Sequence, residues 1–128
     1  MPKLLYDTRF FFEYIYTTND ELHLRAKDFV SKNKDRYVSV VTLHELYLLD
    51  LQKRGREIAK LSLQTIQDLF RVAQVDSKIA ITAAELRNRY KLPMGDSLIA
   101  GTCEALDARC ITDDPHLIRI KEIKTRWF

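Results

Sequence analysis

The chain has 128 residues, enough for one domain that buries its own hydrophobic core without disulfides or structural metals. A composition that is 46% apolar and 30% charged, with three Gly and three Pro, excludes a disordered or low-complexity protein. The net charge of +3 permits a polyanionic partner without requiring one, and no apolar run approaches the roughly 20 residues of a membrane span.

The first half of the chain alternates short apolar runs with helical patterns. Residues 3–7 predict a buried strand, and residues 37–41, rich in β-branched side chains, predict the clearest strand of the chain. A Thr18-x-x-Glu21 capping box predicts the start of a helix that the polar run from Lys32 ends. Further helices are expected over residues 8–16, 42–53 and 57–70.

The second half continues the same alternation. Strands are expected at residues 72–75, 110–112 and 123–127, and helices over 76–90 and 96–108, with a short helical turn over 116–120. Strands that alternate with helices favour a parallel sheet covered on both faces. We therefore predict a single domain over residues 1–128 of the α/β class, an α/β/α sandwich with a mainly parallel central sheet of about five strands.

Four acidic residues lie where this fold places functional groups. Asp7 ends the first strand, Glu45 lies just past the second, Asp96 opens a helix, and Asp114 follows the strand at 110–112. Open α/β sheets form their sites at the carboxyl ends of the strands, so all four can converge there. Converging carboxylates repel one another, and such a group is typical of a site that holds a divalent metal.

Each acid also has a purely structural interpretation. Asp7 and Asp96 are at positions where Asp is a preferred helix N-cap. Thr42-x-x-Glu45 has capping-box spacing, which taken alone favours a structural role for Glu45. Of the neighbours Asp113 and Asp114, one can cap a helix or form an Asx turn, leaving the other free for the site.

Several other side chains bear on function. Arg9, one turn into the first helix, can contact a phosphate near Asp7 or pair with one of the acids, and His116 is a second candidate substrate contact. Cys103 and Cys110 form no metal or redox motif and are expected to be reduced thiols, which favours the cytoplasm. The N-terminus lacks the pattern of a signal peptide. The aromatic run at residues 10–12 is either core, a homodimer interface or part of a docking surface.

Four segments together resemble the PIN domain family, most closely the VapC-type toxins of VapBC modules. The resemblance covers almost the whole chain, and its segments are Leu5-Tyr6-Asp7-Thr8, the run from Val38 to Leu46, Gly95-Asp96-Ser97-Leu98-Ile99-Ala100, and Ile111-Thr112-Asp113-Asp114-Pro115-His116-Leu117.

The resemblance implies specific site residues. It maps the acidic quartet of the family onto Asp7, Glu45, Asp96 and Asp114, as catalytic residues and metal ligands. The Thr-x-Asp form of the last motif selects Asp114 over its neighbour. The hydroxyl residues Thr8 and Thr112 are expected to orient carboxylates or waters, and Asp113 is a fifth, supporting acid. Arg9 departs from the family, where a small or apolar residue is more usual.

The resemblance further implies a Mg²⁺- or Mn²⁺-dependent endoribonuclease, with an RNA substrate, an antitoxin protein as partner and a homodimeric state. The alternative is a PIN-like module that binds RNA or protein without cutting. A phospho-acceptor receiver domain is disfavoured, because there the acid pair follows the first strand, whereas Asp113-Asp114 comes late.

Overall fold

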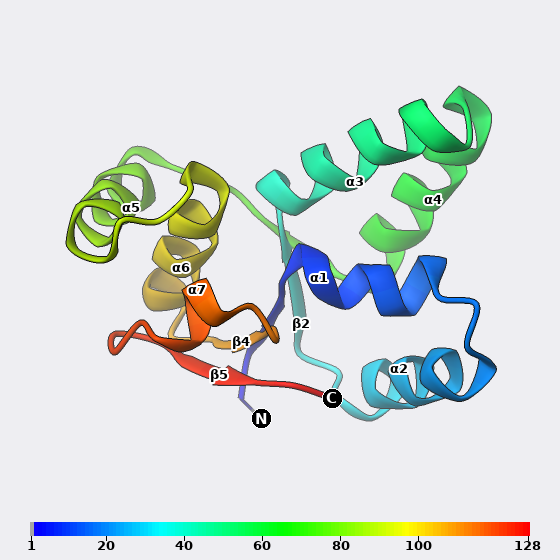
Figure 1. Cartoon of the computed structure of the whole chain (residues 1–128), viewed down its shortest axis with the longest axis horizontal. Coiled ribbons are helices and arrows are strands. Elements are labelled where there is room, and N and C mark those ends of the chain that lie inside the picture. Colours follow the sequence, from blue (N-terminus) through cyan, green and yellow to red (C-terminus); the bar gives the residue numbers. More distant parts are fainter. Residues whose placement is uncertain (1) are drawn as a thin grey trace.

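The computed structural model describes residues 2–128, and its centre is a five-stranded sheet (Figure 1). All neighbouring strands are parallel, in the order β3-β2-β1-β4-β5. The α/β/α class with a parallel sheet of about five strands is confirmed. The strands are β1 (Leu4–Tyr6), β2 (Arg36–Ser39), β3 (Arg71–Ala73), β4 (Arg109–Ile111) and β5 (Lys124–Arg126).

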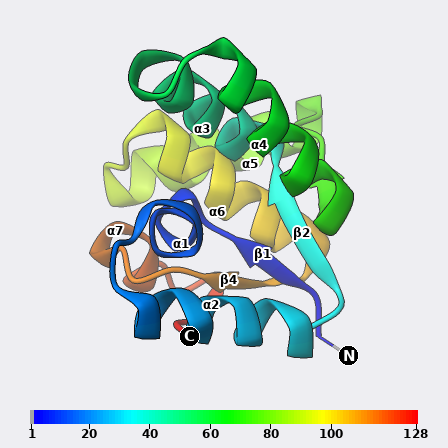
Figure 2. The same cartoon turned by 90° about the vertical axis from the view of Figure 1, so that its right-hand side faces the viewer.

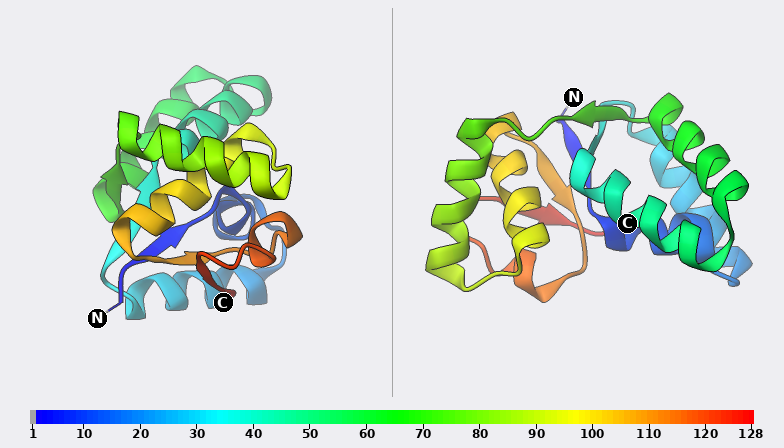
Figure 3. Two further views of the ribbon diagram at one scale, coloured as in Figure 1. Left: turned by 90° about the vertical axis from the view of Figure 1, so that its left-hand side faces the viewer. Right: turned by 90° about the horizontal axis from the view of Figure 1, so that it is seen from above.

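Helices cover both faces of the sheet, as the view from above shows (Figure 3). One face carries α1 (Thr8–Phe11), the π-helical turn η1 (Phe12–Tyr16), α2 (Asp20–Lys32), α3 (Val40–Lys53) and α4 (Arg56–Leu69). The other face carries α5 (Ser77–Tyr90), α6 (Met94–Leu106) and α7 (Pro115–Ile118). None of the helices within residues 2–128 is both long and apolar enough to cross a bilayer.

Side chains along β1 point alternately to the two faces of the sheet and contribute to two separate hydrophobic cores. Leu4 and Tyr6 point to the face covered by α1 to α4, and Leu5 points to the face covered by α5 to α7, because successive strand residues face opposite ways. The ring of Tyr6 meets that of Phe10 at 4.7 Å between centroids, nearly edge to face. Phe10 and Phe11 are fully buried, which confirms the core interpretation for these two rings.

Helix α6 is held close to α5 by a small residue. A Cβ atom on Gly101 would lie 3.1 Å from the carbonyl oxygen of Ile79 and 3.2 Å from the side chain of Ala83. Only a residue without a side chain permits this approach without displacing backbone. The packing fixes α6 against the sheet and so determines where its N-terminal turn, with Asp96, lies.

Helix starts differ from the sequence prediction most clearly at α2, α3 and α6. Helix α3 begins at Val40, two residues early, because the Ser39 hydroxyl accepts a hydrogen bond from the backbone N–H of Val41. Helix α6 begins at Met94, not at Asp96. The cap of α2 is Asn19, whose side chain accepts from Leu22 N–H, so the predicted capping box at Thr18 is wrong.

The order of the strands determines the position of the site. The chain passes from β1 outward through β2 and β3, then crosses to β4 on the other side of β1 (Figure 2). The carboxyl ends of β1 and β4 therefore flank the point where the winding reverses, which is where open α/β sheets form their crevice. Tyr6 pairs with Ile111 in the register, so Asp7 and Thr112 leave the sheet side by side.

Candidate active site

Asp7 is the most buried acid at this edge, with only 4% of its surface exposed. It occupies the N-cap position of α1, but its side chain makes no capping hydrogen bond, so the interpretation as a structural cap is wrong. Its Oδ2 instead accepts a hydrogen bond of 2.8 Å from the Thr112 hydroxyl. Its pKa is raised from 3.8 to about 6, chiefly by burial and also by the charges of Asp96 and Asp114, against the lowering effect of the Thr112 hydrogen bond.

Asp114 caps a helix and also lies close to Asp96 and His116. Its Oδ1 caps α7 by accepting from the backbone N–H of His116 at 2.9 Å. Its own backbone N–H donates to the Thr112 hydroxyl at 3.0 Å. Thr112 therefore ties Asp7 to the β4–α7 turn, and of the two neighbouring acids it is Asp114 that caps α7.

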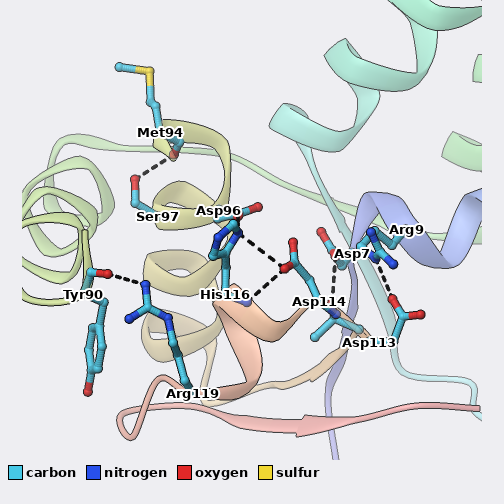
Figure 4. A network of polar contacts seen from close by, with 11 residues as sticks. Asp7, Arg9, Tyr90, Met94, Asp96, Ser97, Asp113, Asp114, His116 and Arg119 are labelled. Carbon is cyan, nitrogen blue, oxygen red and sulfur yellow. Dashed lines mark hydrogen bonds and ion pairs between the residues drawn. The ribbon is translucent and has the colours of Figure 1, made fainter. Parts of the chain in front are cut away.

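Asp96 faces Asp114 from the first turn of α6 (Figure 4). It is not the N-cap, since that position is Pro93. Burial, and then the charge of Asp114, raise the pKa of Asp96, while His116 opposes that rise. The Nδ1 atom of His116 lies 3.3 Å from Asp96 Oδ2 and 3.5 Å from Asp114 Oδ1.

Glu45 reaches the site from α3 and is held there by hydroxyl groups. The Thr8 hydroxyl donates to Glu45 Oε1 at 2.7 Å and lies 3.0 Å from the buried hydroxyl of Thr42. A Cβ atom on Gly95 of α6 would lie 3.7 Å from Glu45 Oε2, so Glu45 extends into the space between α1 and α6. Because α3 begins at Val40, Thr42 is inside the helix and the capping-box interpretation of Glu45 is wrong.

Arg9 and Asp113 form an ion pair beside the four acids Asp7, Glu45, Asp96 and Asp114. Arg9 Nε donates to Asp113 Oδ1 at 2.6 Å, between α1 and the β4–α7 turn (Figure 4). This hydrogen bond raises the pKa of the Arg9 guanidinium. Of the two contacts that the sequence allowed for Arg9, the structure shows the pairing with an acid.

Two features of the site were missed or only partly recognised in the sequence. His116 was considered for substrate alone, yet one atom each from Asp96, Asp114 and His116 lie within 4.8 Å of one another. The role of Thr42 as a support for Thr8 and Glu45 was missed, although the Thr42-x-x-Glu45 spacing was visible. That spacing signals one shared helix face as readily as it signals a cap.

Comparison with known families decides the assignment. The sequence model of the PIN domain family matches residues 4–123. This chain belongs to the PIN domain family. A search of curated protein sequences found no match.

The fold of this PIN domain is shared with several solved structures. DNA-bound VapBC from Salmonella typhimurium is 20% identical with a TM-score of 0.80, covering 98% of each chain. FitAcB from Neisseria gonorrhoeae is also 20% identical, with a TM-score of 0.77 and 95% of each chain covered. VapC20 of Mycobacterium tuberculosis, a Sarcin-Ricin loop cleaving toxin, is 17% identical with a TM-score of 0.71, covering 88% of this chain and 90% of its own.

The buried carboxyl group of Asp7 should make the stability of this PIN domain depend on pH. Since the pKa of Asp7 is raised from 3.8 to about 6, the folded protein binds a proton that the unfolded chain releases between these values. Stability due to Asp7 is therefore highest at low pH and is lost as pH rises toward 6.

We accordingly predict that, in EDTA at pH 7.5, Asp7→Asn increases the free energy of unfolding by about 1–3 kcal/mol, and that the gain shrinks at pH 4. Urea denaturation followed by circular dichroism measures it. Asp35→Asn, the same charge change at the amino end of β2, is the control and should have little effect. Equal stability of Asp7→Asn and the parent at pH 7.5 would contradict the burial of a charged Asp7.

Proposed function

We propose that this PIN domain is a divalent-metal-dependent endoribonuclease. The observation that carries the proposal is the convergence of acids at the β1–β4 crevice: Asp7, Asp96 and Asp114 influence one another's charge, and Glu45 extends toward them from α3. Each of these acids comes from a different element, and hydroxyl groups of the chain donate hydrogen bonds to two of them, Asp7 and Glu45. The fold shared with VapC20, which is described as a Sarcin-Ricin loop cleaving toxin, supports a cleaving activity.

The residues present suit a hard divalent cation. The donor set consists of carboxylate oxygens with one imidazole nitrogen, and oxygen ligands of this kind are preferred by Mg²⁺ and Mn²⁺. Asp96, Asp114 and His116 would hold the cation most directly, because their ligand atoms are within 4.8 Å of one another. Asp7 and Glu45 would complete the site from β1 and α3, directly or through water.

A bound Mg²⁺ or Mn²⁺ would neutralise the carboxylates, polarise the scissile phosphate and favour ionisation of an attacking water. The chain itself supplies orientation. Thr112 holds the Asp7 carboxylate in place, and Thr8 does so for Glu45. Hydrolysis would break the bond between phosphorus and O3′, leaving a 3′-hydroxyl and a 5′-phosphate.

We also propose that the protein is the toxin of a toxin–antitoxin pair, acting in the cytoplasm as a homodimer. Support comes from the shared fold with subunits of VapBC and FitAcB complexes. An apolar groove of about 250 Å³ between η1 and α4 would receive the antitoxin. Its wall includes Ile58 and Leu61, which are 46% and 70% exposed. Phe10 and Phe11, considered for docking from the sequence, are in the core instead.

Asp96→Asn should abolish metal-dependent cleavage while leaving the fold intact, because it removes one carboxylate charge from the proposed cation site and little volume. The measurement is cleavage of a panel of structured RNAs with and without Mg²⁺, with mapping of the product ends. Glu104→Gln, an exposed acid on the same helix, should cleave at the parent rate. Full activity of purified Asp96→Asn would falsify the assignment.

Calorimetric titration with Mn²⁺ tests the cation site independently of activity. The parent should take up Mn²⁺, and Asp96→Asn should bind it at least tenfold more weakly. His116→Ala should weaken binding about tenfold, since it removes a ligand atom beside two carboxylates, whereas His23→Ala on α2 should change nothing. Absence of Mn²⁺ uptake by the parent would instead favour a non-catalytic binding module.

Expression in a bacterial host tests the toxin assignment. The parent should arrest growth, because cleavage of cellular RNA stops protein synthesis, and Asp96→Asn should not. Asp35→Asn should arrest growth like the parent, since Asp35 lies at the amino end of β2 and the four acids lie at the carboxyl ends of the strands. Growth measured by optical density after induction, with expression checked by immunoblot, decides the outcome; equal growth of all three strains would refute toxicity.

A further inference from the structure

The proposed function gives no role to the ion pair between Arg9 and Asp113, which lies next to the four acids. Arg9 is in the first turn of α1, two residues after Asp7, and Asp113 immediately precedes Asp114. The pair thus joins the residues that follow β1 to those that follow β4. Both side chains remain accessible, with 48% and 41% of their surface exposed, so they lie on the solvent side of the buried Asp7 (Figure 4).

The charge around the crevice poses a problem for an RNA ligand. Asp7, Glu45, Asp96 and Asp114 concentrate negative charge where a polyanionic strand would have to enter, and like charges at this range repel. Arg9 carries a positive charge at that entrance, because an arginine guanidinium stays protonated throughout the physiological pH range. A cation at this position would attract the strand while leaving the acids available.

The geometry of Arg9 suits a phosphate better than it suits a purely structural role. A guanidinium has five N–H donors, and Arg9 directs its Nε donor to Asp113. No hydrogen bond joins its two terminal nitrogens to any residue in the range 2–128. Two neighbouring terminal N–H groups match the spacing of two phosphate oxygens, which is the usual bidentate contact of arginine.

We propose that Arg9, oriented by Asp113, binds a backbone phosphate of an RNA strand that lies along the four acids. Asp113 is a positioning residue in this arrangement, because it fixes the guanidinium through Nε and leaves the terminal nitrogens without a hydrogen bond to any residue from 2 to 128. The inference rests on the proposed function only in taking the crevice as an RNA site. The competing explanation is a surface tie between α1 and the β4–α7 turn, which would contribute about 0–1 kcal/mol to stability and nothing to binding.

RNA binding in the absence of cleavage tests the proposal. The protein is the full chain carrying Asp96→Asn, in EDTA, and the probe is a fluorescein-labelled, mixed-sequence, single-stranded RNA of 20 nucleotides. Fluorescence anisotropy gives Kd between 50 and 300 mM KCl. Adding Arg9→Ala should weaken binding about tenfold and reduce the slope of log Kd against log salt by about 0.7, the contribution of one phosphate contact. Arg9→Lys should restore the slope but only part of the affinity.

The matched control is Arg56→Ala, which removes an exposed arginine at the start of α4 and should alter Kd by less than about twofold and leave the slope unchanged. Urea denaturation of each variant excludes loss of folding as the cause. If Arg9→Ala binds RNA like its parent, with the same salt slope, the proposal is overturned.

A double-mutant cycle with Asp113→Ala tests the positioning role. The loss caused by Arg9→Ala should be clearly smaller when Asp113 is already absent, because an unoriented guanidinium contributes less. Equal losses in both backgrounds would show that Asp113 does not position Arg9.

These outcomes are separable from those of the nuclease proposal. If the parent never cleaves RNA but Arg9→Ala weakens binding as described, the nuclease proposal fails and the phosphate contact stands. If the parent cleaves with Mg²⁺ and Arg9→Ala leaves Kd and the salt slope unchanged, the nuclease proposal stands and the Arg9 contact fails.

Discussion

The hydrogen bond from Thr112 to the buried carboxylate of Asp7 holds the site together. It joins the residue after β1 to the residue after β4, across the point where the winding of the sheet reverses. The same hydroxyl accepts the backbone N–H of Asp114, so one side chain sets the relative positions of two acids. Both acids depend on the pairing of β1 with β4, and the register of those strands is in turn held by the cores on the two faces.

Burying a carboxylate beside others costs free energy, and the molecule offsets only part of that cost. Thr112 stabilises the charged form of Asp7, yet burial still raises its pKa to about 6. Around this centre, Asp114 gains from the N-terminus of α7, and His116 lies against both Asp96 and Asp114. A group assembled at such cost is typical of a functional site, because a purely structural position would favour a neutral residue.

Much of the fold followed from local patterns. The alternation of apolar runs with helical periodicities predicted the parallel sheet, and the helix expected over residues 76–90 is present as α5, capped by Asp76. Helix starts were less predictable, because any of several neighbouring side chains can cap an exposed N–H group. Ser39 caps α3 in place of Thr42, and this shift of the cap by three residues converts Thr42 from an expected cap into a buried support for Thr8. For Asp114, capping and membership of the site were treated as alternatives, although one carboxylate has two oxygens and can serve both.

By itself the sequence determined the class of fold, the edge of the sheet at which the acids meet and, through its motifs, the family to which the chain belongs. It could do so because periodicity and strand ends are properties of short segments. Only the tertiary structure decided that His116 joins Asp96 and Asp114, that Thr8 holds Glu45, and that Arg9 pairs with Asp113. These contacts depend on the directions of side chains from elements that are distant in the chain, and those directions are set by packing between the elements.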